Sequence, residues 1–151
     1  MFAPVLGPQF DLKKLPATAK LFGDLGVTED EVSKVYKSYF KRPRPWIVDP
    51  HLKTCQAHKP GPALNSYPSG HATVAFLMGV VLASIIPDKA QAILERSEQF
   101  AENRLVCGMH FRSDIIAGQT FGTLLAVELM QSASFTPEYD AAAAELHAAH
   151  L

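Results

Sequence analysis

The sequence has little cysteine and no excess of either charge, and both shortages limit what the protein can be. Its two cysteines, Cys55 and Cys107, are too few for a disulfide scaffold and lack the spacing of a metal site, so they form either one bridge or two buried thiols. Fourteen Lys and Arg stand against fifteen Asp and Glu, and the net charge of −1 argues against a nucleic-acid partner. Seven of the fourteen bases nevertheless lie between Lys34 and Lys59, where Asp49 is the only acid, which favours a small anionic ligand.

Long hydrophobic runs are also lacking. The longest, Ala72 to Ile86, has fifteen residues, whereas a membrane-spanning helix needs about 20, so we expect a core helix and no membrane-spanning segment. The N-terminus lacks the features of a secretory leader, which leaves an intracellular protein or one whose leader has been removed. No internal repeat or linker divides the chain, and 48 % of its residues are hydrophobic, so we predict one domain over residues 1–151.

Helical patterns account for most of the remaining sequence, and we predict an all-α helical bundle. Thr28 fits the N-cap of a helix that Pro43 and Pro45 end. Five prolines between Arg44 and Pro68 indicate an ordered loop. Further helices are expected over about residues 70–86, 88–106 and 111–130 and in the alanine-rich tail.

The helix over residues 111–130 is apolar on most of its sides, and Gly118 and Gly122 would allow another helix to come close. We expect it to form the centre of the bundle together with the helix over residues 70–86. The polar residues that open these two buried helices then need an explanation.

The segment "PSGH", residues 68–71, opens the first of the two helices. A helix N-terminus exposes unpaired backbone N–H groups and the positive end of the helix dipole. Ser69 and Gly70 could therefore hold an anion, and His71 could donate a proton to it. The alternative is an ordinary N-cap at Ser69 and a surface histidine.

Two other segments carry paired polar residues. His110 and Asp114 are four residues apart, so the carboxylate can accept the N–H of one ring nitrogen and leave the other as the free lone pair that a nucleophile requires. Arg104 precedes them, and Lys37 and Arg44 lie seven apart across a helix end. The alternatives are a structural His–Asp pair, an ion-paired surface arginine and solvated bases. A metal site at His110 and Asp114 lacks a third ligand.

The order and spacing of these residues resemble the three-part signature of the type 2 phosphatidic acid phosphatase superfamily. "SYPSGH" and "CGMHFRSD" are most similar to the bacterial class A non-specific acid phosphatases. The chain departs from the pattern at Asn103, where serine is usual, and at Met109, where an aromatic residue is common, and both bear on the shape of the pocket. The resemblance implies the helical bundle of the acid phosphatases and vanadate haloperoxidases, in a domain that lacks the N-terminal part of the family pattern.

The resemblance also implies metal-independent hydrolysis of small phosphomonoesters of broad range at mildly acidic pH, with no cofactor. It makes His110 a nucleophile that becomes phosphohistidine, Asp114 the group that orients it, and His71 the acid and then the base. The phosphate-binding residues that it implies are Lys37, Arg44, Ser69, Gly70 and Arg104. It further suggests a periplasmic or secreted protein and is compatible with a homo-oligomer.

Three rival functions share parts of this pattern. A vanadate-dependent haloperoxidase has a similar signature, but such enzymes are much larger. An integral-membrane lipid phosphatase is disfavoured because no spanning segment is expected. A non-catalytic phosphate-binding protein is disfavoured because both histidines and Asp114 are present.

Overall fold

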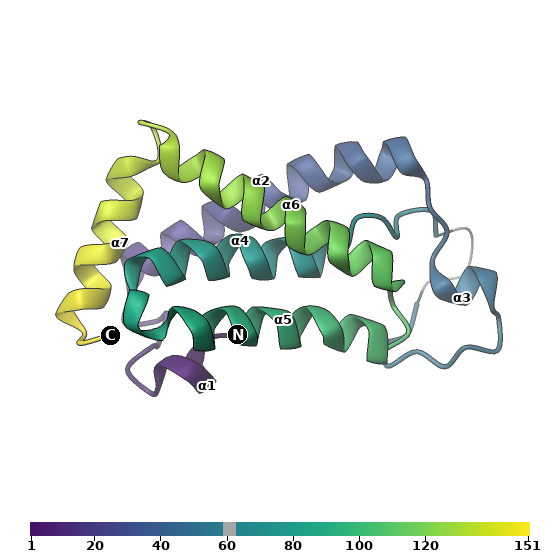
Figure 1. Cartoon of the computed structure of the whole chain (residues 1–151), viewed down its shortest axis with the longest axis horizontal. Helices are drawn as coiled ribbons and strands as arrows, with labels where there is room; N and C mark the ends of the chain where they lie inside the picture. Colours follow the sequence, from purple (N-terminus) through teal and green to yellow (C-terminus); the bar gives the residue numbers. More distant parts are fainter. Residues whose placement is uncertain (59–62) are drawn as a thin grey trace.

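Helices form most of the chain in the structure, a computed structural model that describes residues 1–58 and 63–151 (Figure 1). The helices are α1 (Ala3–Leu6), α2 (Pro16–Phe40), α3 (Pro45–Val48), α4 (Gly70–Ile85), the 3₁₀ turn η1 (Pro87–Lys89), α5 (Ala90–Val106), α6 (Arg112–Gln131) and α7 (Thr136–Ala148). No strand occurs in these two ranges, so the all-α prediction is confirmed. The segment from Arg44 to Pro68, expected to be a loop, contains the short helix α3, and Pro60 and Pro62 lie outside the described residues.

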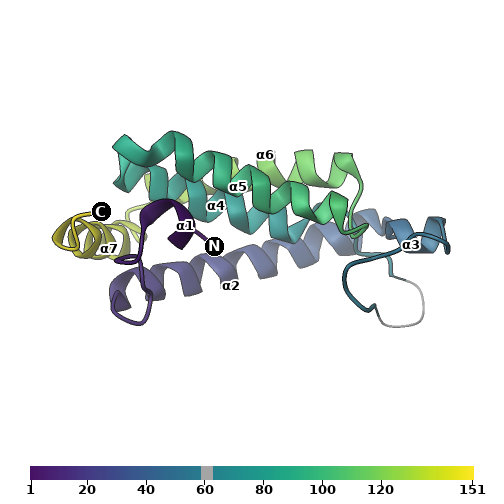
Figure 2. The ribbon, with the colours of Figure 1, turned by 90° about the horizontal axis from the view of Figure 1, so that it is seen from below.

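Helix α4 is the centre of the bundle. It packs against α6, α5 and α2, while α7 contacts α2 at the far end. Figures 1 and 2 show α4, α5 and α6 side by side, with α2 running along one face of this layer. The main core gathers apolar side chains from several of these helices, including Leu21, Leu25, Leu77, Val81, Leu82 and Ile93.

Two glycines allow α6 to lie directly against α4, as the sequence predicts. A Cβ on Gly118 would lie 2.6 Å from the Ser69 carbonyl oxygen and 2.8 Å from the Ala72 Cβ. A Cβ on Gly122 would overlap the Thr73 carbonyl oxygen. Only residues without a side chain permit this approach between the backbones.

The outer side of α6 corrects the expectation that this helix, which is apolar on most of its sides, is a buried helix. Ile116 is 53 % exposed and Leu124 is 62 % exposed, and Val127 is exposed as well. Apolar composition alone does not bury a helix, because α6 has α4 on one side and no packing partner among the described residues over Ile116 and Leu124.

The N-cap predicted at Thr28 is wrong. Helix α2 begins twelve residues earlier, at Pro16, and the Thr28 hydroxyl donates to the Asp24 carbonyl oxygen in its interior at 2.8 Å. The Glu145 carboxylate of α7 accepts hydrogen bonds from the Ala17 and Thr18 N–H groups at 3.0 and 2.8 Å. A carboxylate from the other end of the chain therefore satisfies the first turn of α2, and no local pattern reveals such a cap.

Cys55 and Cys107 are joined by a disulfide, which settles the two alternatives left by the sequence. The Cys55 N–H also donates to the Cys107 carbonyl oxygen at 3.2 Å. The bridge attaches the segment after α3 to the turn that follows α5. Within the described residues, no helix is both long and apolar enough to cross a membrane.

Candidate active site

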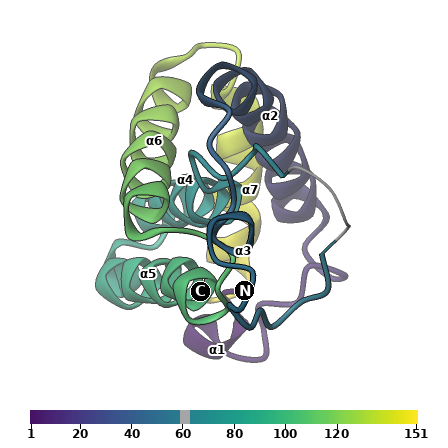
Figure 3. The same cartoon turned by 90° about the vertical axis from the view of Figure 1, so that its right-hand side faces the viewer.

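Four helix ends meet at the end of the bundle that carries α3. The carboxyl ends of α2 and α5 and the amino ends of α4 and α6 lie there, as Figures 1 and 3 show. Each of the three polar sequence segments is attached to one or two of these ends. The fold therefore gathers residues that are more than seventy positions apart in the sequence.

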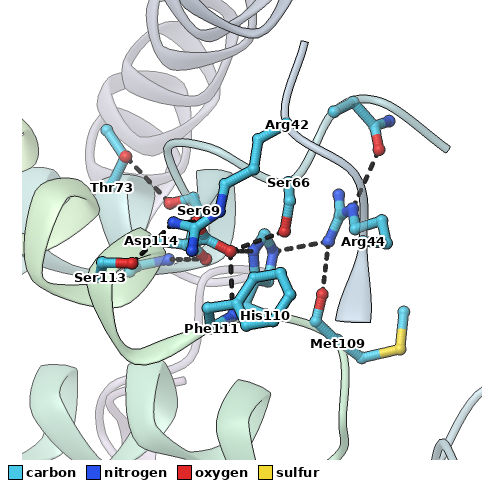
Figure 4. A network of polar contacts seen from close by, with 12 residues as sticks. Arg42, Arg44, Ser66, Ser69, Thr73, Met109, His110, Phe111, Ser113 and Asp114 are labelled. Atoms are coloured by element: carbon cyan, nitrogen blue, oxygen red, sulfur yellow. Dashed lines mark hydrogen bonds and ion pairs between the residues drawn. The ribbon is translucent and has the colours of Figure 1, made fainter. Parts of the chain in front are cut away.

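His110 and Asp114 form the predicted pair at the start of α6 (Figure 4). The His110 Nδ1 lies 3.3 Å from the Asp114 Oδ2, and both side chains are buried. The other ring nitrogen, Nε2, lies 2.8 Å from the Arg44 Nη1. Because a guanidinium can only donate, Nε2 accepts this hydrogen bond, and the neutral ring then carries its proton on Nδ1 and donates it to Asp114.

Asp114 is fully buried and fully occupied as an acceptor. Its Oδ2 accepts from the Ser66 hydroxyl at 2.6 Å and from the Phe111 N–H at 2.9 Å, and its Oδ1 accepts from the Arg42 Nη1 at 2.7 Å. Burial raises the pKa of Asp114. The hydrogen bonds from His110, Ser66 and Phe111 and the charge of Arg42 lower this pKa by more than burial raises it, so the net shift is downward. The carboxylate stays ionised beside the histidine.

His110 itself is held in its neutral form. Burial is the largest influence and lowers the pKa of the ring, Asp114 raises it, and Arg44 and Arg104 lower it again. The net shift is downward. A neutral ring with one anchored nitrogen and one lone pair is the form that a nucleophile or base requires.

Arg44 is fixed by contacts on three sides. Besides His110, its Nη1 donates to the Met109 carbonyl oxygen at 2.9 Å, and its Nε donates to the Asn65 Oδ1 at 2.9 Å. Met109, a departure from the family pattern, therefore contributes its backbone to the site. The guanidinium also stands over the Trp46 ring, 5.6 Å from the ring centroid.

The start of α4 is tied directly to the start of α6. The Ser69 N–H donates to the Asp114 carbonyl oxygen at 3.0 Å, and the Ser69 hydroxyl oxygen accepts from the Ala72 N–H at 3.4 Å. Ser69 is thus the N-cap, which was the alternative reading of this residue, and Figure 4 shows it next to Asp114.

Gly70 leaves room for a lysine at the amino end of α4. A Cβ on Gly70 would stand 3.0 Å from the Lys37 Nζ and 3.0 Å from the Glu29 Oε1. Any other residue at position 70 would therefore press on both charged groups. Lys37 lies in the last turn of α2, and its side-chain ammonium makes no hydrogen bond or ion pair with another described residue, although its carbonyl oxygen accepts from the Lys41 N–H.

Arg104 lies in the last turn of α5 and is 8 % exposed, so it is not the ion-paired surface arginine of the alternative reading. Its Nη2 donates to the Gln56 Oε1 at 3.2 Å, while its buried Nε has no partner among the described residues. Burial lowers the pKa of Lys37, Arg44 and Arg104 alike. The site thus concentrates positive charge, buried at Arg104 and half-buried at Lys37 and Arg44, for which the described residues supply few acceptors.

His71 differs from the other site residues because it is exposed. Its ring stacks near Phe100, with the centroids 6.0 Å apart. Desolvation, followed by the charges of Arg104, His110, Lys37 and Arg44, lowers the pKa of His71 to about 4. In the absence of an anion the ring is therefore neutral at neutral pH.

Sequence reasoning missed four residues of this region: Arg42, Ser66, Asn65 and Glu29. Arg42 also donates to the Ser113 hydroxyl at 2.6 Å and stands 4.4 Å from the centroid of the Phe111 ring. The only available signal was position, since Arg42 is two residues from Arg44 and Ser66 is three residues from Ser69. The hydrogen-bond partners of Arg42 and Ser66 lie on α6, and no local pattern in the sequence indicates these contacts.

Comparison with known proteins assigns the family. Residues 23–136 match the family model of the PAP2 superfamily. The chain belongs to the PAP2 superfamily. The matched range covers all three polar segments of this PAP2 chain, from Lys37 to Asp114.

Curated relatives carry phosphatase names. The chain is 33 % identical over 150 residues to an acid phosphatase of Zymomonas mobilis, a match that covers 98 % of this chain and 56 % of the relative. It is 30 % identical over 138 residues to a non-specific acid phosphatase of Salmonella typhimurium, covering 89 % of this chain and 55 % of the relative. The PAP2 chain thus spans about half the length of these curated relatives.

The residues that the structure describes contain no group of three or more His, Cys, Asp and Glu side chains arranged to hold a metal ion. His110 and Asp114 are both engaged by cationic or N–H donors. This arrangement suits an anion, since Lys37, Arg44 and Arg104 lie close enough together for their charges to act on His71.

Proposed function

We propose that this PAP2 chain hydrolyses phosphate monoesters through a phosphohistidine intermediate on His110. The observation that carries the proposal is the state of the His110 ring, whose Nδ1 is anchored by Asp114 and whose Nε2 lone pair faces the half-buried Arg44 guanidinium. The names of the curated relatives, acid phosphatase and non-specific acid phosphatase, support the phosphatase activity in this proposal.

Three cationic side chains and two neutral donors bind the phosphate in this proposal. Lys37, Arg44 and Arg104 supply the charge that the equatorial oxygens of a phosphoryl group require, and the Ser69 hydroxyl and the Gly70 N–H add neutral donors at the helix start. In the free protein the Arg44 guanidinium donates a hydrogen bond to the Nε2 lone pair of His110. A bound substrate therefore has to draw the guanidinium away from the ring before attack begins.

The first step transfers the phosphoryl group to the enzyme. The Nε2 lone pair forms a bond to phosphorus while the bond to the leaving oxygen breaks, and the imidazole becomes positively charged. Asp114, held ionised by Arg42 and Ser66, stabilises that charge and keeps the ring in orientation. His71 gives its proton to the leaving oxygen.

The second step returns the enzyme to its starting state. The His71 ring, now neutral, takes a proton from water as the oxygen of that water attacks phosphorus, and the bond from phosphorus to Nε2 breaks. In the free protein the pKa of His71 is lowered to about 4. The substrate dianion opposes the surrounding cations and raises this pKa, so the acid form of the ring accompanies the bound substrate.

Several features of the whole protein stay proposals. We infer small phosphomonoesters of broad range as substrates, one domain over residues 1–151 and an oxidising compartment such as the periplasm. The disulfide between Cys55 and Cys107 supports the last of these, because such bonds persist in oxidising environments.

Detection of the phosphoenzyme tests the proposal. The protein is mixed with a radiolabelled aryl phosphate and quenched, and the expected label is stable in alkali and lost in acid. His110→Ala should lose turnover and label together, whereas His150→Ala, at the end of the chain remote from the site, should keep both. Label of undiminished amount in His110→Ala would overturn the assignment of the nucleophile.

A further inference from the structure

A buried carboxyl group lies at the edge of the phosphate site and has no part in the mechanism above. Glu29 stands on α2, eight residues before Lys37, and is 8 % exposed. Residues eight apart on a helix lie on the same face, so Glu29 and Lys37 point toward the same neighbour. Buried carboxyl groups are uncommon unless they are paired or functional.

Glu29 reaches the same point at the start of α4 as Lys37 does. Its Oε1 and the Lys37 Nζ each lie 3.0 Å from the place that a Cβ on Gly70 would occupy. The Ser33 hydroxyl, one turn along α2, donates to the Glu29 Oε1. The carboxyl oxygen is therefore held beside Gly70 and near the Lys37 ammonium, and the proposed function assigns both of these residues to phosphate binding.

The charges around Glu29 leave it only partly compensated. On α2, Lys37 favours the carboxylate and Asp30 disfavours it. Helix α4 brings the uncharged Gly70, followed by His71, which is neutral in the free protein. Helix α7 meets α2 near Thr18, several turns away, and α6 meets it through the uncharged pair Tyr36 and Phe121.

We infer that Glu29 couples anion binding to proton uptake: it is a carboxylate in the free protein and takes one proton from solvent when a phosphoryl dianion occupies the site. The inference rests on the proposed function, because that function places the dianion beside Gly70. Two negative charges in adjacent, partly buried positions cannot both persist without a large cost, and uptake of a proton by the Glu29 carboxylate removes one of them.

The protonation behaviour of Glu29 agrees with this geometry. Burial raises the pKa of the carboxyl above its ordinary value, while the Ser33 hydrogen bond and the Lys37 charge offset part of the increase. A bound dianion adds a like charge and raises the pKa further. By linkage, each such anion binds with uptake of a proton at any pH between the two values of the pKa.

The consequence is that the affinity of the site for an anion increases as the pH decreases. Between the two pKa values, anion affinity increases by up to about tenfold for each unit of decrease in pH. Above this window Glu29 repels the anion. Glu29 thus sets how many protons the site takes up when an anion binds. This role is distinct from that of His71, which acts as the acid and then the base in the reaction.

The test uses sulfate, which keeps its two charges across the working pH range and so contributes no proton of its own. Isothermal calorimetry in two buffers of different ionisation enthalpy gives both the affinity and the number of protons taken up. Wild type is compared with Glu29→Gln, which mimics the neutral acid, and with Glu31→Gln, the same chemical change at an exposed site two residues away. Thermal unfolding of each variant confirms that it is folded.

Glu29→Gln should bind sulfate more tightly than wild type at neutral pH, should equal it in acid, and should take up fewer protons. Glu31→Gln should follow wild type. Proton uptake that is the same in Glu29→Gln and wild type would overturn the inference. So would weaker binding by Glu29→Gln at every pH, since the carboxylate would then serve only to hold Lys37.

The same measurements separate this inference from the proposed function. If wild type binds sulfate with Glu29-dependent proton uptake but hydrolyses no phosphomonoester, the inference holds and the catalytic proposal fails. If wild type forms phosphoenzyme and turns over while Glu29→Gln keeps the wild-type proton uptake, the catalytic proposal holds and the inference fails. Absence of sulfate binding together with absence of turnover would overturn both.

Discussion

Replacing Gly118 by alanine should loosen the contact that holds the two halves of the site together. The new Cβ would lie 2.6 Å from the Ser69 carbonyl oxygen and 2.8 Å from the Ala72 Cβ, so α4 and α6 must separate at the point where both helices begin. Overpacking of this kind costs about 1–3 kcal/mol. Helix propensity returns about 0.5–1 kcal/mol of this cost, because alanine is a better helix former than glycine.

The control is a glycine-to-alanine substitution at a helical position where the new Cβ would contact no other atom. Gly23 lies inside α2, is exposed, and a Cβ built there would meet no atom within 4 Å. Gly23→Ala should therefore stabilise the protein by about 0.5–1 kcal/mol, whereas Gly118→Ala, whose propensity gain is subtracted from the overpacking cost, should destabilise it by up to about 2.5 kcal/mol. Urea unfolding followed by circular dichroism measures both free energies of unfolding.

Activity supplies the second measurement. Separation of α4 from α6 moves Ser69 and Gly70 away from His110, and a misplacement of about 1 Å can cost about 10²-fold in rate. We expect kcat/KM for an aryl phosphate to decrease markedly in Gly118→Ala and to stay at the wild-type value in Gly23→Ala. If Gly118→Ala were as stable and as active as Gly23→Ala, the close packing of the two helix starts would be refuted.

Three further predictions concern other parts of the site. Ser66→Ala removes a donor from the buried Asp114, whose pKa is lowered in the folded state, so the free energy of unfolding should decrease by about 1.5–3 kcal/mol near neutral pH. This difference should shrink as pH decreases through the pKa of Asp114, and a constant difference across the pH range would contradict it. Reduction of the bridge between Cys55 and Cys107, which are 52 positions apart, should lower the free energy of unfolding by about 4 kcal/mol in the chain-entropy model, and equal urea midpoints with and without reductant would refute this. His71→Ala should lower kcat/KM for alkyl phosphates about 10²- to 10⁴-fold more than for p-nitrophenyl phosphate, because only the alkyl alcohol needs a proton to leave. In wild type the alkyl rate should rise as pH falls toward the His71 pKa of about 4, and equal losses for both substrates would show that His71 only binds phosphate.

Local patterns in the sequence were sufficient for several parts of this protein. The helix over residues 70–86 was predictable from the Ser69 cap and from Pro87, which cannot continue it. The contact between His110 and Asp114 was predictable from their spacing of four residues across a helix start, although His110 itself precedes α6, which begins at Arg112. The glycines of α6 indicated a close helix neighbour, and α4 is that neighbour. Each of these inferences depends on spacing within one short segment of the sequence.

Contacts between distant segments were decided only by the tertiary structure. The start of α2 depends on the Glu145 carboxylate, and the ionisation of Asp114 depends on Ser66 and Arg42. No periodicity within α2 indicates that Glu29 reaches Gly70, because that contact exists only after α2 packs against α4. Sequence spacing thus determines which residue types can form the site, whereas their pKa values, exposure and hydrogen-bond partners follow from charges and burial that arise when separate helices meet.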